Sequence, residues 1–144
     1  MKVILIALMF ISSFTYASSD FGTWGTTCDD DSFLISLKEN SSPLIVSDNQ
    51  IVISVHSKKI NSKVIDVFFD NTLDFGRGGM GFNWGSIDKT KKIAELTYDS
   101  KNKGTMKWFG FWDTKKHANF WVKEPDFVQS YAKDGVIDLI RCEE

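Results

Sequence analysis

The residues best suited to chemistry in this chain are aromatic side chains in a short stretch interrupted by glycine. Residues 108–112 read Trp-Phe-Gly-Phe-Trp, and a further pair of rings follows at 120–121. If 108–112 is a strand, Trp108 and Trp112 share one face. A polar turn at 113–116 would then return the chain as a hairpin, with Trp121 opposite Trp112. Aromatic residues with a charged rim are typical of protein-binding surfaces, and they also stack on sugar rings. Packing in the core is the alternative for each ring.

A second candidate stretch, residues 76–85, contains five glycines in ten residues. No Gly-Lys-Ser/Thr follows, so it is not a phosphate-binding loop. Glycine permits a loop to remodel around a partner, and loops often carry binding residues. A flexible connection or a bulged strand is the alternative. The binding residues expected from both stretches are Arg77, Met80, Phe82, Trp84, Trp108, Trp112 and Trp121.

The first 17 residues have the pattern of a signal peptide. Lys2 precedes an apolar run at 3–11, and Thr15 and Ala17 supply the small residues of a cleavage site. The run is too short to span a bilayer of about 30 Å, so an N-terminal anchor is the weaker alternative. No later segment is apolar enough to cross a membrane. We expect a single secreted β-rich domain over residues 18–144, in a periplasmic or secreted bacterial protein.

The charge of the mature chain argues against nucleic acid as a partner. Without Lys2 there are 16 basic residues against 19 acidic ones. Proteins that bind nucleic acid normally present a strongly basic face.

The chain has two cysteines, Cys28 and Cys142, near the two ends of the mature domain. In an exported protein they favour a disulfide bond over two free thiols. Such a bond would clamp the first ordered segment to the last. In the chain-entropy model, closing a loop of roughly 115 residues stabilises the fold by about 4–5 kcal/mol. It would also remove both thiols from the possible nucleophiles and metal ligands.

No motif in the sequence predicts catalysis or a cofactor. His56 and His117 form no His-Glu-x-x-His pair, and there is no Gly-x-Ser-x-Gly elbow. The acidic run 29–31 lacks the ligand spacing of a calcium loop. A Ser/His/Asp group assembled in space, or paired carboxylates for glycoside hydrolysis, remain alternatives. Of the carboxylates within strands, Asp66 and Glu95 are expected to point outward. We therefore expect a protein that is not an enzyme and binds neither metal nor cofactor.

Alternating apolar and polar residues predict a mainly β fold. One helix is expected near residues 125–133, because Pro125 suits a first helical turn and Gly135 can end the helix. The predicted architecture is a small antiparallel barrel or sandwich with this one helix, its first and last strands joined by the disulfide. The expected strands lie at 33–38, 51–56, 64–69, 93–98, 106–109 and 136–142.

Two short patterns at the ends of the domain resemble the lipocalin-type (calycin) barrels. They are Gly22-Thr23-Trp24 near the mature N-terminus and Arg141 in the last strand. The resemblance implies a barrel in which Trp24 closes one end and Arg141 packs across it. A guanidinium over an indole face is a favourable cation–π contact, worth about 0.5–2 kcal/mol. The family also implies a cavity for a small ligand.

The functional hypothesis is an exported, non-enzymatic binding protein. Its small size, its closure by a disulfide and its interface-like residues favour an inhibitor or immunity-type protein that binds another protein. One alternative is a calycin-like carrier of a small apolar ligand. The other is a glycan- or peptidoglycan-binding module that uses Trp108 and Trp112.

Overall fold

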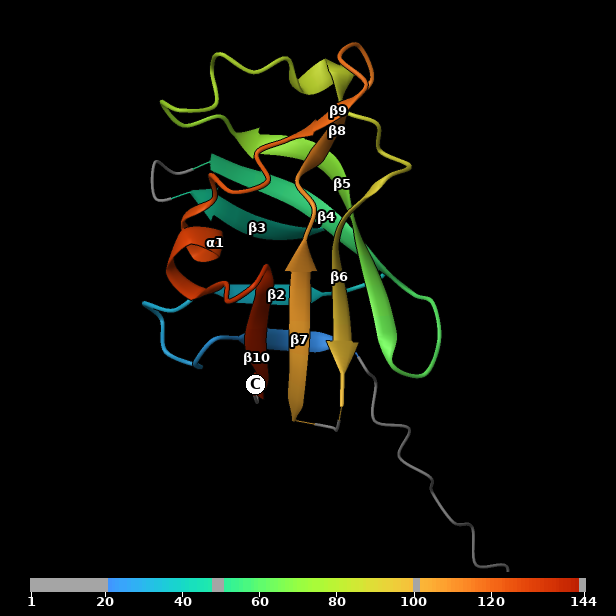
Figure 1. The fold of residues 1–144 in the computed structure, drawn as a ribbon, viewed down its shortest axis with the longest axis vertical. Coiled ribbons are helices and arrows are strands. Elements are labelled where there is room, and N and C mark those ends of the chain that lie inside the picture. The colour runs from blue at the N-terminus through green and yellow to red at the C-terminus, as the bar shows by residue number, and fades with distance from the viewer. Residues whose placement is uncertain (1–20, 48–50, 100–101, 143–144) are drawn as a thin grey trace, which may run out of the picture.

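The computed structural model describes residues 21–47, 51–99 and 102–142 (Figure 1). The predicted signal peptide, residues 1–17, lies outside these ranges. The first strands are β1 (Gly22–Gly25), β2 (Leu34–Leu37), β3 (Ser42–Ser47), β4 (Ile51–Lys59) and β5 (Val64–Asp74). They are followed by the 3-10 helix η1 (Trp84–Ser86), β6 (Lys92–Tyr98), β7 (Lys103–Trp108), β8 (Phe111–Asp113), β9 (Ala118–Phe120), α1 (Asp126–Tyr131) and β10 (Val136–Cys142).

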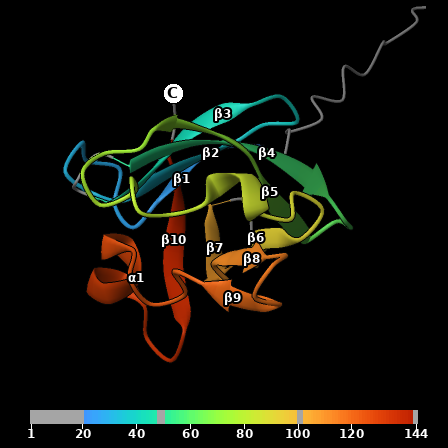
Figure 2. The ribbon, with the colours of Figure 1, turned by 90° about the horizontal axis from the view of Figure 1, so that it is seen from above.

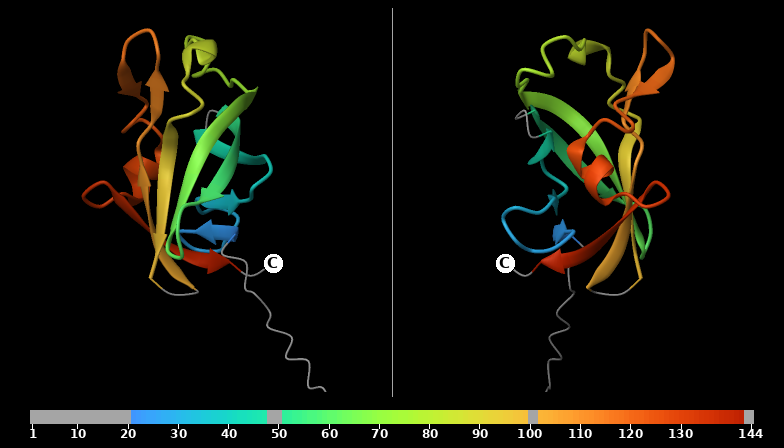
Figure 3. Two further views of the ribbon diagram at one scale, coloured as in Figure 1. Left: turned by 90° about the vertical axis from the view of Figure 1, so that its right-hand side faces the viewer. Right: turned by 60° about the vertical axis from the view of Figure 1, so that its left-hand side comes forward.

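Eight strands form one antiparallel sheet in the order β2-β1-β10-β7-β6-β5-β4-β3. The sheet curls on itself into a nearly closed barrel, as the view from above shows (Figure 2). Strands β8 and β9 form a separate hairpin beyond one end of the barrel (Figure 3). The mainly β class, the barrel-like sheet and the one α-helix found in the described part of the chain are as predicted.

Period-two patterning explains why these segments are strands. On β4 the side chains of Ile51, Ile53 and Val55 all point into the barrel and are fully buried. The pairing of β4 with β5 shifts register twice, once on each side of Ile53. Such bulges bend and twist a long strand. They help this long pair of strands to curve around the core.

The barrel is tied together where its first strand meets its last. β1 pairs with β10, and Trp24 lies opposite Arg141 in this ladder. Cys28 and Cys142 are joined by a disulfide across 114 residues of sequence. The predicted bridge is confirmed, and it joins Cys28, just after the first strand, to Cys142 at the end of the last strand. The disulfide is compatible with an extracytoplasmic protein.

The barrel stays partly open between β2 and β3, the two edge strands of the sheet. The two strands are consecutive in the chain and lie closest near the turn that joins them. There the Ser42 hydroxyl donates to the Ser36 carbonyl at 2.8 Å. In the described residues no backbone ladder joins β2 to β3. A seam therefore widens away from the turn.

Two local predictions needed correction. No strand was expected between residues 38 and 51, but Ser42–Ser47 form β3, because Leu44 and Val46 face the core. Its proline is tolerated because β3 is an edge strand. The helix is shorter than 125–133, since Ala132 is already extended. None of the helices formed by the described residues is long and apolar enough to cross a membrane.

Candidate binding site

The glycine-rich stretch and the aromatic hairpin meet at one end of the barrel, here called the loop end. It consists of residues 73–88 and the β8–β9 hairpin (Figure 3). Backbone hydrogen bonds join the two: Asp88 N–H donates to Trp112 O, and Thr114 N–H donates to Ser86 O, each at 2.9 Å. The sequence placed binding residues in both stretches, and the structure brings the two stretches together at one end of the barrel.

Eight connected rings fill the interior of the loop end, and we call them the aromatic cluster. Phe111 is fully buried at its centre, with its ring 5.6 Å from that of Phe69 and 5.5 Å from that of Trp84. Edge-on and tilted ring pairs of this kind add about 0.5–1.5 kcal/mol each beyond burial. The cluster consists of Phe69, Phe75, Phe82, Trp84, Trp108, Phe111, Phe120 and Trp121.

The glycine-rich loop has a defined conformation over this cluster. Trp84 Nε1 donates to Gly79 O at 2.8 Å, and Gly79 N–H donates to Phe75 O at 2.9 Å. A Cβ at position 79 would lie 2.2 Å from the Phe75 carbonyl oxygen, so only glycine fits there. The glycine thus lets the backbone close tightly over the rings.

The predicted binding residues divide by exposure. Arg77 is exposed and Met80 is 80 % exposed, so both face solvent. Phe82, Trp84, Trp112 and Trp121 are half-buried. Trp108 is only 6 % exposed, and its Nε1 donates to Trp121 O at 2.9 Å inside the fold. The binding role of all seven stays a prediction, but only some of them present a surface to a partner.

The expectation that Trp108 and Trp112 share one face of a strand is wrong. β7 ends at Trp108, and Gly110 takes a φ of +77° before β8 begins. A side chain at position 110 would collide with Phe120 O at 2.3 Å. The two tryptophans therefore belong to different sheets. Trp112 lies opposite Asn119 rather than Trp121, because Trp121 follows the last paired residue of the hairpin.

Two exposed residues of this end were missed from the sequence. Leu73 and Phe75 are 59 % and 47 % exposed at the end of β5. The strand expected at 64–69 ends before both residues. Instead β5 continues to Asp74. Asp70 is part of this strand, and its carboxylate accepts a hydrogen bond from the Ser41 hydroxyl. The two-residue spacing of Leu73 and Phe75 is the one local pattern that indicates a longer strand with both side chains on the same face.

Two lysines lie over rings of the loop end, one over half-buried Trp112 and one over buried Phe69. Lys91 Nζ lies 5.7 Å from the ring centre of Trp112, and Lys89 Nζ lies 6.0 Å from that of Phe69. Cation–π contacts at exposed positions are worth about 0.5–1 kcal/mol. With Arg77, these side chains give the loop end a basic rim.

Asp113 holds the turn of the hairpin. Its Oδ1 accepts from the N–H groups of Lys115 at 2.8 Å and Lys116 at 3.2 Å. Burial alone would raise the pKa of this carboxyl group, but the hydrogen bonds outweigh it and lower the pKa below its ordinary value. The ionised form is therefore the one that fits the turn.

The catalytic alternatives can be compared with the geometry. Asp70 lies between His56 and Ser41: His56 Nδ1 is 2.5 Å from one carboxylate oxygen, and the Ser41 hydroxyl donates to the other at 2.9 Å. The serine is thus bound to the acid rather than to the base, which is not the order of a nucleophilic triad. The described residues contain no group of three or more His, Cys, Asp or Glu placed to hold a metal ion.

The two strand carboxylates, Asp66 and Glu95, form ion pairs that link neighbouring strands of the sheet. Asp66 and Glu95 are cross-strand partners on the outer face, as the expectation of outward-pointing side chains required. Lys92 Nζ lies 2.5 Å from Glu95 and 3.3 Å from Asp66. The bond to Glu95, helped by Asp66, raises the pKa of Lys92. The three side chains form one ion-pair network across β5 and β6.

The opposite end of the barrel, here called the disulfide end, contains the residues of the calycin resemblance. The Arg141 guanidinium lies 5.9 Å from the ring centre of buried Trp24, and its Nη2 donates to Phe21 O at 2.6 Å. A Cβ at position 22 would lie 3.3 Å from the same nitrogen, so Gly22 leaves space for the arginine. The contact that the resemblance implies is present.

No family model, curated protein or solved structure matches this chain. Membership of the calycin family therefore stays a prediction.

Proposed function

We propose that this is an exported, non-enzymatic protein of the inhibitor or immunity type, and that it binds another exported or periplasmic protein through the loop end. The contact surface consists of Leu73, Phe75, Arg77 and Met80, with Trp112 at its edge. The other seven rings of the aromatic cluster support this surface and do not themselves reach the partner.

The observation that carries the proposal is a group of exposed apolar side chains on a well-braced loop. Among the described residues, eight large apolar side chains are exposed, and three of them lie within residues 73–80. Apolar side chains gathered on a surface mark contact sites more often than single ones do. Arginine and methionine are also enriched at interfaces.

Bracing matters because it lowers the cost of binding. A loop that must be ordered on contact loses conformational entropy, which subtracts from affinity. Here the Trp84 and Gly79 hydrogen bonds and the ring contacts below hold the loop before any partner arrives. The proposed surface is thus pre-organised, which suits an inhibitor that must bind tightly.

The two alternatives have less support. A glycan platform required Trp108 and Trp112 on one face, and Trp108 is buried. A carrier needs space inside the barrel, where large side chains such as Phe69, Met106 and Trp24 are fully buried. Neither alternative gains a specific observation from the loop end.

The test is affinity capture from a concentrated extracytoplasmic extract of the source cells, followed by titration of the captured protein when purified. We expect Met80→Asp and Leu73→Asp each to weaken binding by about tenfold or more, because a carboxylate would be buried in an apolar contact. Circular dichroism checks that each variant is folded.

Ile60→Asp is the matched control. Ile60 is 50 % exposed in the β4–β5 turn, at the other end of β5 from Leu73. It should leave the affinity within about twofold, because surface changes away from the contact have small effects. A partner bound equally well by wild type and both loop-end variants would refute the proposed surface, and hydrolytic turnover by the pure protein would refute the non-enzymatic function.

A further inference from the structure

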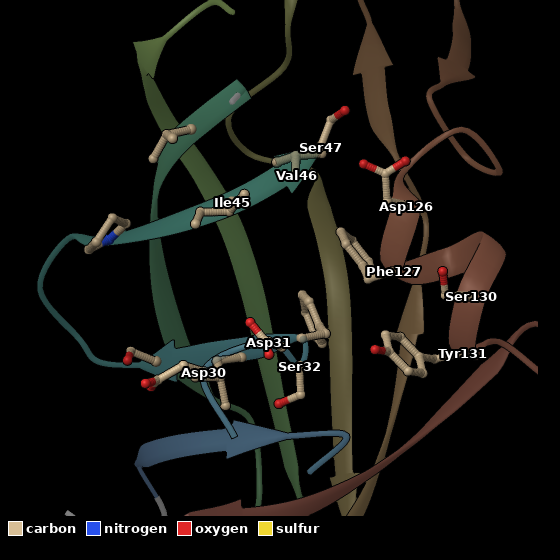
Figure 4. A pocket seen from close by; sticks show the side chains of 15 residues that line it. Asp30, Asp31, Ser32, Ile45, Val46, Ser47, Asp126, Phe127, Ser130 and Tyr131 are labelled. Carbon is tan, nitrogen blue, oxygen red and sulfur yellow. The ribbon is translucent and has the colours of Figure 1, made fainter. Parts of the chain in front are cut away.

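The seam between the edge strands β2 and β3 opens into a groove that the loop-end proposal does not use. The groove has a volume of about 710 Å³ and is bounded by β2, β3 and helix α1 (Figure 4). This size lies in the range of sites that bind ligands. Phe33 and Phe127, stacked at 4.3 Å, line its inner part.

The walls of the groove are the two edges of the sheet. All neighbouring strands are antiparallel, so β2 and β3 run in opposite directions along the seam. Edge strands present backbone groups to any extended chain that lies beside them. Because no ladder joins β2 to β3 in the described residues, an added strand would fill the one gap in the barrel.

The side chains that line the groove also select its occupant. They include three carboxylates, Asp30, Asp31 and Asp126, and among the described lining residues there is no lysine, arginine or histidine. Figure 4 places Asp30 and Asp31 beside β2, and Asp126 on α1 near the end of β3. The carboxylates therefore flank the groove on both sides.

Apolar groups complete the pattern. Val46 and Phe127 are buried at the inner side, while Ile45 on β3 is 62 % exposed at the outer side. An extended peptide turns alternate side chains to opposite faces. In a peptide with apolar residues at every second position, the apolar side chains would pack toward Phe33 and Phe127. The remaining side chains would then reach the carboxylates.

We propose that the seam binds an extended, basic segment of another polypeptide by strand addition between β2 and β3. The segment has about six residues, the length of β3, and alternates lysine or arginine with apolar residues. It runs antiparallel to one edge strand and parallel to the other. This proposal rests on the seam alone and is independent of the loop end.

The test uses a fluorescein-labelled hexapeptide of alternating lysine and valine, titrated with the full mature protein and followed by fluorescence anisotropy. We expect saturable binding that weakens as salt is raised, because exposed charge pairs are screened. The glutamate–valine peptide of the same length should bind at least about tenfold more weakly, since it places like charges together.

Protein variants test the carboxylates. The triple variant Asp30→Asn, Asp31→Asn, Asp126→Asn should lose about tenfold in affinity for the lysine–valine peptide. Asp138→Asn removes an exposed carboxylate on β10 outside the groove and should change the affinity by less than about twofold. Equal affinities for the triple variant and wild type would overturn the proposal.

A modified peptide tests strand addition itself. N-methylation of alternate residues keeps the charge but removes the N–H groups that pair with a strand edge. We expect this peptide to bind at least about tenfold more weakly, and the unmodified one to slow amide hydrogen exchange in β2 and β3. Equal binding of both peptides would refute strand addition. A protein dimer that the triple variant dissociates would assign the seam to a second copy of the chain instead.

Discussion

The two ends of the barrel are closed by different means. At the disulfide end, a covalent bond joins Cys28 to Cys142, and Arg141 packs over Trp24. At the loop end, contacts between rings and a few loop hydrogen bonds provide the closure. A covalent clamp needs little surface, whereas ring packing needs many side chains. The end that is closed by packing is also the end where the exposed side chains of Leu73, Phe75 and Met80 lie.

The largest effect is expected from removing the covalent clamp. The double variant Cys28→Ser, Cys142→Ser should lose about 4–5 kcal/mol of unfolding free energy, because the unfolded chain regains the freedom of a 114-residue loop. Urea denaturation measures the difference. Wild type with a reducing agent is the control and should behave like the variant. A loss below about 1 kcal/mol would mean that the pairing of β1 with β10 suffices without the bond.

Removing the central ring of the loop end should have a slightly smaller effect. Phe111→Ala should cost about 3–4 kcal/mol, because it leaves a cavity among four neighbouring rings. The measurement is again urea denaturation, with near-ultraviolet circular dichroism to report on the tryptophans. Met80→Ala, at an exposed position of the same loop, should change stability by less than about 0.5 kcal/mol. Similar losses for both would contradict the division of the loop end into a packed interior and a free surface.

The smallest effect is expected from the cation–π contact at the disulfide end. Arg141→Leu should cost about 1–2 kcal/mol, through loss of the contact with Trp24 and of the hydrogen bond to Phe21 O. Arg77→Leu, which changes an exposed arginine of the loop end, is the matched control and should be nearly neutral. If the two substitutions had equal effects on unfolding, Arg141 would have no special part in closing its end.

Local patterning explains which parts of the fold were predictable. The strands near 51–56, 64–69 and 93–98 have long runs of β-branched and apolar residues, and they were found. β3 was missed because it is short and contains Pro43, which is tolerated only through its edge position. The break between Trp108 and Trp112 depends on Gly110, because both its positive φ and its close approach to the Phe120 carbonyl require glycine. That contact comes from tertiary structure and has no local signal.

The same distinction applies to the candidate site. Arg77 and Met80 in the glycine-rich loop are exposed, and their role in binding stays a prediction. The burial of Trp108 and the packing of Phe82 against Trp121 depend on how residues 75–87 fold onto the hairpin. No sequence pattern within the glycine-rich stretch or the hairpin indicates that the two pack against each other. These aromatic side chains therefore pack inside the loop end instead of forming an exposed surface.

The strand order of the barrel has a consequence for how fast the chain can fold. β1 has β2 and β10 as its partners, so half of its pairing awaits the last strand of the domain. Contacts between residues so far apart in sequence slow folding, because a long loop must close before they form. The reduced chain must find this pairing by diffusion. A chain that unfolds with its bridge intact keeps its first and last strands as neighbours, and should therefore refold faster.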